Sequence, residues 1–137
     1  MPLAIQMIMR SSLLKVTLIC GGLFFLIGAF VHWFGLSFFP WYDRALYSPY
    51  HDSLIALFCF FLTILLVAIA YDPAKNKHAL TAVIVGVLIV ALFDVLIPLK
   101  INFASLGAPI KKTETIIEGV IGFIYALLLI LLYPKYD

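Results

Sequence analysis

The side chains that could do chemistry in this chain are a few imidazole and carboxyl groups beside long apolar runs. If those runs are antiparallel helices, the groups fall at one end of the molecule: His32, His51, Asp52, Asp94 and Glu118. Such groups transfer protons, hydrogen-bond polar ligands or bind metal ions. The opposite end offers only Asp72, His78 and Asp137 as comparable groups. The sequence therefore predicts a polar mouth at one end.

Each acidic residue of this mouth also has a structural interpretation. Asp52 can cap the N-terminus of a helix, because its side chain can accept a hydrogen bond from a backbone N–H. Glu118 can close a capping box with Thr115. Asp94 can pair with Lys100 near the membrane interface, although an acid inside an apolar run is a functional candidate by default. The structural and the functional interpretations both stay open.

No spacing in the chain predicts a metal site or a cofactor. Glu-x-x-His and His-x-x-x-His are absent, so metal ligands would have to come singly from different helices. The sequence also lacks a phosphate-binding loop and a Gly-x-Ser-x-Gly nucleophile elbow. Cys20 and Cys59 lie far apart within apolar runs, which favours a packing role for both. His32 can equally be hydrogen-bonded to a carbonyl group.

The elements that must position these groups are membrane-spanning helices. Hydrophobic residues make up 65% of the chain and charged residues 12%, whereas soluble domains average about 45–50% and about 25%. Several apolar runs are close to the roughly 20 residues that a spanning helix needs. The sequence predicts an all-α polytopic membrane protein, an antiparallel four-transmembrane-helix bundle that forms a single domain over residues 1–137. The predicted helices cover about residues 16–36, 53–71, 79–99 and 113–133.

Small residues recur at helical spacing within these runs and predict helix contacts. Helices in lipid approach one another through such residues, because hydrophobicity does not drive their association there. The glycines that we expect at contacts are Gly21, Gly28, Gly86 and Gly122. The stripes that contain them lead toward the ionisable residues of the mouth, so these faces should point into the bundle.

The charges and the first residues of the chain bear on its topology. The N-terminus, the second loop and the C-terminus hold five cations, against four in the first and third loops. Membrane proteins keep more Lys and Arg on the cytoplasmic side, which favours cytoplasmic termini. Met1–Met9 is too short to span and predicts a helix extension, an interfacial segment or a docking arm. The net charge of +2 is evenly spread and does not indicate nucleic-acid binding.

The second apolar run carries a family resemblance. It begins with His51-Asp52 and ends with Asp72-Pro73, in the stretch HDSLIALFCFFLTILLVAIAYDP. This stretch, with the overall hydropathy, resembles small bacterial four-helix membrane proteins of the DoxX-like and BphX-like kind. The resemblance implies an integral protein of a prokaryotic cytoplasmic membrane. Because those groups mostly have no assigned activity, it transfers no functional residue to this chain.

Three functional hypotheses follow from these features. The first is an accessory or structural subunit of a larger integral membrane complex, without chemistry of its own. The alternative is a small binder or enzyme that acts on a lipophilic molecule, quinone- or lipid-like, at the polar mouth. The third is a proton- or ion-coupled transporter, which would need ionisable groups through the full membrane thickness. The expected partners are the lipid bilayer and other integral membrane subunits.

Overall fold

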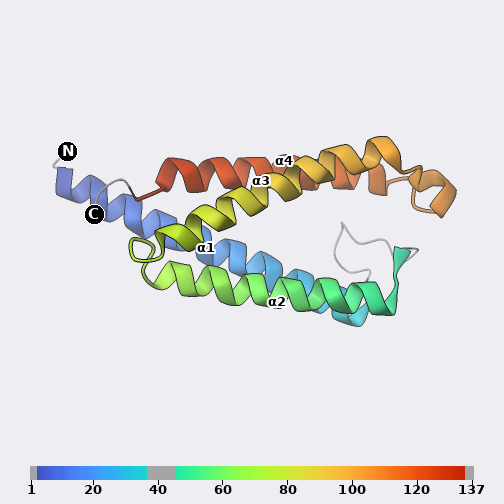
Figure 1. The fold of residues 1–137 in the computed structure, drawn as a ribbon, viewed down its shortest axis with the longest axis horizontal. Helices are drawn as coiled ribbons and strands as arrows, with labels where there is room; N and C mark the ends of the chain where they lie inside the picture. Colours follow the sequence, from blue (N-terminus) through green and yellow to red (C-terminus); the bar gives the residue numbers. More distant parts are fainter. Residues whose placement is uncertain (1–2, 37–45, 135–137) are drawn as a thin grey trace.

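The computed structural model describes residues 3–36 and 46–134, which fold into four long helices (Figure 1). The helices are α1 (Leu3–Phe34), α2 (Pro49–Tyr71), α3 (Lys77–Lys100) and α4 (Lys111–Leu132), with a 3₁₀ helix, η2 (Phe103–Leu106), between α3 and α4. Each long helix is long and apolar enough to cross a membrane. The prediction of an all-helical chain with four such helices is confirmed for these residues, whereas Asp137 lies outside them.

All four helices begin earlier than the sequence predicted, α3 and α4 by two residues and α1 and α2 by more. α1 begins at Leu3 rather than near Val16, so Leu3–Met9 is a helical extension of the first span. With 32 residues, α1 is about 48 Å long, well beyond the ~30 Å hydrocarbon core. α2 begins at Pro49 rather than Ser53. Proline suits the first helical position, because its fixed φ is helical and its missing N–H would have no partner there.

The helices form two antiparallel hairpins, α1–α2 and α3–α4 (Figure 1). Contacts are extensive within each hairpin, whereas α1 and α4 meet at fewer places. We call the end with the starts of α1 and α3 and the ends of α2 and α4 the terminal side. The opposite end is the loop side. In Figure 1 the hairpins lie together at the terminal side and diverge toward the loop side.

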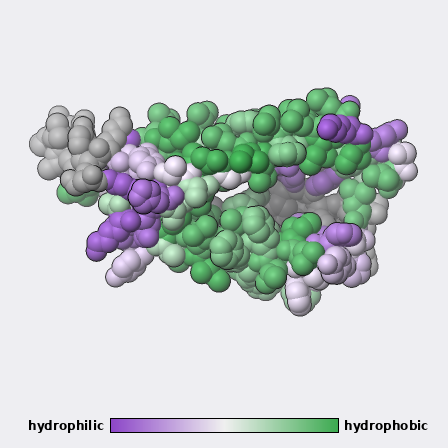
Figure 2. Space-filling model, in the orientation of Figure 1, coloured by the Kyte–Doolittle hydropathy of each residue, from purple (hydrophilic) through white to green (hydrophobic). Residues whose placement is uncertain are grey.

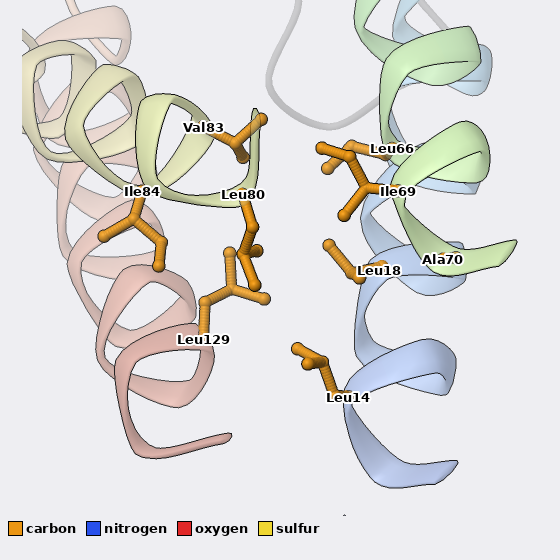
Figure 3. Packing of buried hydrophobic residues seen from close by; sticks show 9 residues of the cluster. All are labelled: Leu14, Leu18, Leu66, Ile69, Ala70, Leu80, Val83, Ile84 and Leu129. Atoms are coloured by element: carbon orange, nitrogen blue, oxygen red, sulfur yellow. The ribbon is translucent and has the colours of Figure 1, made fainter. Parts of the chain in front are cut away.

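In the described part of the chain, an apolar cluster joins the hairpins at the terminal side (Figure 3). Leu80 and Leu129 point from the α3–α4 hairpin toward Leu18 and Ile69 of the α1–α2 hairpin. All four side chains are at most 1% exposed. The cluster consists of Leu14, Leu18, Leu66, Ile69, Ala70, Leu80, Val83, Ile84 and Leu129. Its many close carbon contacts hold the two hairpins together.

Toward the loop side the same helix faces become uncovered. Val83 of α3 is 8% exposed, but Val90, two turns further along that face, is 53% exposed. On α2, Ile69 is 1% exposed and Ile55, four turns earlier on that face, is 42% exposed. In Figure 2 the described parts of the two hairpins stand apart in this region of the molecule. We call this space, bounded by the faces of Val90 and Ile55, the wedge.

Glycines allow the closest approach between α3 and α4. An added Cβ at Gly119 would lie 2.8 Å from the backbone oxygen of Ala91. At Gly122 an added Cβ would lie 3.0 Å from the Cβ of Ala91. The predicted contact at Gly122 is therefore present, and Gly119 makes a closer one that sequence analysis did not name.

The glycines of α1 also lie at helix contacts. Tyr125 of α4 lies over Gly21, where an added Cβ would overlap its phenol ring. The Tyr125 hydroxyl donates to the backbone oxygen of Thr17 at 3.3 Å, which links α4 to α1. An added Cβ at Gly28 would lie 3.7 Å from the Sγ of Cys59 on α2, an ordinary packing distance.

Gly86 differs from the other predicted contact glycines. An added Cβ there would meet none of the described residues within 4 Å. The predicted contact at Gly86 does not form, because α4 packs on the face of α3 that carries Val87, Ala91 and Val95.

We expect Gly119→Ala to destabilise the α3–α4 hairpin and Gly86→Ala to leave it intact. The methyl group at Gly119 must displace backbone, and overpacking of this kind costs about 1–3 kcal/mol. At Gly86 the methyl group enters open space and favours the helix by up to ~1 kcal/mol. Unfolding in mixed micelles, followed by circular dichroism, measures both changes. Equal stability of the two variants would contradict the close packing at Gly119.

Candidate functional site

A carboxylate–imidazole pair joins α1 to α2 at the loop side. The Nδ1 atom of His32, in the last turn of α1, lies 2.6 Å from Oδ1 of Asp52, in the first turn of α2. Asp52 is buried at 4% exposure, whereas the His32 side chain is 25% exposed. With Asp52 ionised, Nδ1–H donates to it, so the pair fixes which ring nitrogen carries the proton.

The start of α2 explains how Asp52 reaches this position. Pro49 is the first helical residue and Ser48 is the N-cap, so Asp52 is not the cap that sequence analysis considered. Instead Asp52 lies inside the first turn, and its Oδ2 accepts a hydrogen bond from the backbone N–H of Ser48 at 2.7 Å. Both carboxylate oxygens are thus engaged, one by the helix start and one by His32.

His51 lies beside this pair but points elsewhere. Its Nδ1 lies 2.9 Å from the Ser48 hydroxyl, and its ring packs edge-on against Tyr50. The residue is exposed. Within the described residues, Ser48 is the group that bonds to both His51 and Asp52, so His51 joins the pair only indirectly.

A second polar cluster forms between α3 and α4. The Nζ of Lys111 lies 3.5 Å from Oε1 of Glu118 and 3.8 Å from Oε2 of Glu114. Asp94 faces α4, since its Cβ is 3.2 Å from where a Cβ of Gly119 would stand. Lys111 forms ion pairs with these two glutamates, and no ion pair between Asp94 and Lys100 is found among the described residues.

The capping box considered for Glu118 does not form. α4 begins at Lys111 with Ile110 as its N-cap, and Thr115 therefore lies within the helix. There the Thr115 hydroxyl donates to the backbone oxygen of Lys111 at 2.8 Å. Glu118 lies two turns after Lys111 on the same helix face, which leaves it free of capping and places it beside the lysine. This spacing was visible in the sequence, but Lys111 was not among the predicted mouth residues.

The predicted mouth is thus divided between the hairpins. His32 and Asp52 lie on the α1–α2 hairpin, and Asp94 and Glu118 lie with Lys111 on the α3–α4 hairpin. The contacts described above join residues within each hairpin. In residues 3–36 and 46–134, no three His, Cys, Asp or Glu side chains gather into a group that could hold a metal ion.

We expect Asp52→Asn to loosen the α1–α2 hairpin. Asparagine keeps one acceptor oxygen but places an NH₂ donor against the N–H of either His32 or Ser48. Hydrogen bonds to a charged group contribute about 1.5–3 kcal/mol, so the free energy of unfolding in micelles should fall by about that amount. The matched control is Asp72→Asn in the α2–α3 turn, which should cost less, because this side chain is more exposed than Asp52 and the asparagine amide oxygen can still accept the Lys75 N–H. Similar losses in both variants would count against a special role for the buried pair.

Comparison with protein-family models, curated proteins and solved structures gave no match. The resemblance to DoxX-like and BphX-like proteins therefore stays a prediction. The two aspartates on which the resemblance depends lie at the two ends of α2. Asp52 lies in its first turn, and Asp72 follows its last turn, where the carboxylate accepts a hydrogen bond from the N–H of Lys75. This hydrogen bond lowers the pKa of Asp72 from its ordinary value.

Proposed function

We propose that the chain is an accessory or structural subunit that packs against other integral membrane chains and does no chemistry of its own. The observation that carries the proposal is the wedge. Lipid satisfies the outward faces of all four helices, which are apolar. At the terminal side, one face of α2 and one face of α3 pack against the other hairpin. Toward the loop side the same two faces are exposed, at Ile55 and at Val90.

Packing within membranes supports a protein partner at the wedge. Association of helices in hydrocarbon depends on close side-chain and backbone contact rather than on exclusion of water. Each hairpin has such contacts internally, at Gly119 and Gly28 for example, but the hairpins diverge from each other. A helix of another chain inserted at the wedge would gain contact with both hairpins at once.

The proposed location is a prokaryotic cytoplasmic membrane, with the terminal side in the cytoplasm. The described cations of the terminal side are Arg10, Lys15, Lys75 and Lys77. Those of the loop side are Lys100, Lys111 and Lys112, and Lys111 is paired with glutamates. The positive-inside rule then favours cytoplasmic termini.

Photo-crosslinking from the wedge tests the subunit proposal. A photoreactive side chain at Val90 should form an adduct with another chain in the native membrane. The matched control is the same group at Ile64, which is 68% exposed and lies on a different face of α2 from Ile55. We expect a defined adduct from position 90 and little from position 64. Native mass analysis in mild detergent should show the same partner.

Two results would overturn the subunit proposal. One is a lone chain of 15.3 kDa in native mass analysis, with no protein adduct from position 90. The other is equal crosslinking from positions 90 and 64, which would indicate random collisions rather than a partner at the wedge.

The buried His32–Asp52 pair favours a second candidate function, a site for a lipophilic molecule. An imidazole held by a carboxylate is a common way to position a proton for a ligand or a reaction. Carbonyl- or hydroxyl-bearing molecules of the quinone or lipid type match that chemistry, and they can enter the wedge from the bilayer.

Extraction of co-purified small molecules tests the second candidate. Wild-type protein should retain a lipophilic compound that organic extraction and mass spectrometry detect, and Asp52→Asn should lose most of it. Glu114→Gln, on the other hairpin, serves as the control and should retain the compound. Absence of any compound enriched over bulk lipid would remove this candidate and leave the subunit proposal untouched.

A further inference from the structure

An open groove at the terminal side combines apolar walls with a single guanidinium group. Its volume is about 520 Å³, and it lies between the N-terminal part of α1 and the end of α4. Ile8, Met9, Leu13 and Val16 of α1 and Leu132 of α4 line it together with Ser12, and nearly all of its accessible surface is apolar. Arg10 lines the same groove. The groove therefore offers an apolar trough with a fixed positive charge.

Arg10 is held in place by the end of α4. One of its Nη atoms donates to the backbone oxygen of Leu131 and to that of Tyr133, the latter at 3.2 Å. The last carbonyls of a helix have no partner within it and carry the negative end of the helix dipole, so a cation is favoured there. These bonds fix the guanidinium at the level where α4 ends, which is the level of the membrane interface.

The charge of Arg10 is not neutralised by the described protein. No carboxylate of residues 3–36 or 46–134 forms an ion pair with it, and its Nε–H is buried without a hydrogen-bond acceptor. Lys15, Lys75 and Lys77 add to the positive charge of this side, and Asp72 is its one acidic side chain within residues 3–36 and 46–134. A half-buried guanidinium beside an apolar trough thus has no ion-pair partner in the described part of the chain.

We propose that the groove binds an anionic phospholipid of the surrounding bilayer. An acyl chain lies along Leu13, Val16 and Leu132, and the phosphate group lies beside Arg10. Phosphate oxygens pair well with guanidinium donors, and lipid phosphates occupy the interfacial level where α4 ends. The anionic lipids of the cytoplasmic leaflet match the positive charge of the terminal side. This site is separate from the wedge and does not depend on the proposed function.

Native mass spectrometry of the full chain with two lipids tests this site. The protein is mixed with equal amounts of phosphatidylglycerol and phosphatidylcholine in a neutral detergent, and retained lipid is counted. Wild type should retain phosphatidylglycerol in preference to phosphatidylcholine. Arg10→Gln should weaken phosphatidylglycerol binding about fivefold, the factor that one basic residue contributes at an anionic surface. It should weaken phosphatidylcholine binding less, because the choline ammonium group already offsets the charge of that lipid's phosphate.

Matched variants separate the groove from general surface charge and from misfolding. Lys75→Gln removes a cation whose side chain is 86% exposed and which does not line the groove, so the preference should persist. Arg10→Lys keeps the charge and should keep the preference. Leu132→Trp keeps Arg10 but fills the trough, and it should reduce retention of both lipids while circular dichroism shows intact helices.

Several results would overturn the lipid site. Equal retention of both lipids by wild type would remove the charge preference. An unchanged preference in Arg10→Gln, or an equal loss in Lys75→Gln, would indicate diffuse surface charge instead of a site. If Arg10→Gln does not fold, undiminished retention by folded Leu132→Trp would overturn the proposal by itself. If the chain retains another protein at the groove and no lipid, the groove is the binding site of a protein partner.

Discussion

The contact on which the rest of this architecture depends is the apolar cluster around Leu18, Ile69, Leu80 and Leu129 at the terminal side. It joins the two hairpins, and the contacts of Tyr125 with α1 and of Arg10 with the end of α4 add to it on the same side of the molecule. The cluster lies at one end of the molecule, so α2 and α3 diverge from each other toward the other end (Figure 1). The exposure of Val90 is a consequence of this divergence. Both the wedge and the division of the polar residues follow from this placement.

The two levels of packing use different side chains for a physical reason. Within the hairpins, Gly119 and Gly122 let α3 and α4 meet backbone to backbone, which maximises contact where lipid and protein compete on equal terms. Between the hairpins the cluster is built mainly from leucine and isoleucine. Long side chains hold the helix backbones further apart, and lipid tails can replace such contacts more easily. The hairpins are therefore the firm units, and the join between them is the weaker one.

The sequence predicted what depends on local pattern. Apolar runs of spanning length determine the four helices, and the contact at Gly122 follows from helical spacing. The sequence did not predict which face of α3 packs against α4, because the rotation of a helix about its axis depends on the partner helix. Gly86 was therefore wrongly placed at a contact. The N-cap assignment to Asp52 was wrong because Pro49 starts α2 a turn earlier. The pairing of Lys111 with Glu118 depended on a helix start at Lys111, two residues before the predicted one.

The cost of burying charge explains why the polar residues stay close to the loop side. An isolated carboxylate in hydrocarbon is expensive, and Asp52, Glu114 and Glu118 each have a polar partner near a helix end. Asp52 has His32 and the Ser48 N–H, while Glu118 has Lys111. Each set is satisfied inside its own hairpin, so neither requires the hairpins to close. An apolar occupant of the wedge, whether a helix or a lipophilic molecule, therefore finds Asp52 and Glu118 already paired. That arrangement suits packing against a partner better than chemistry that needs an unpaired acid or base.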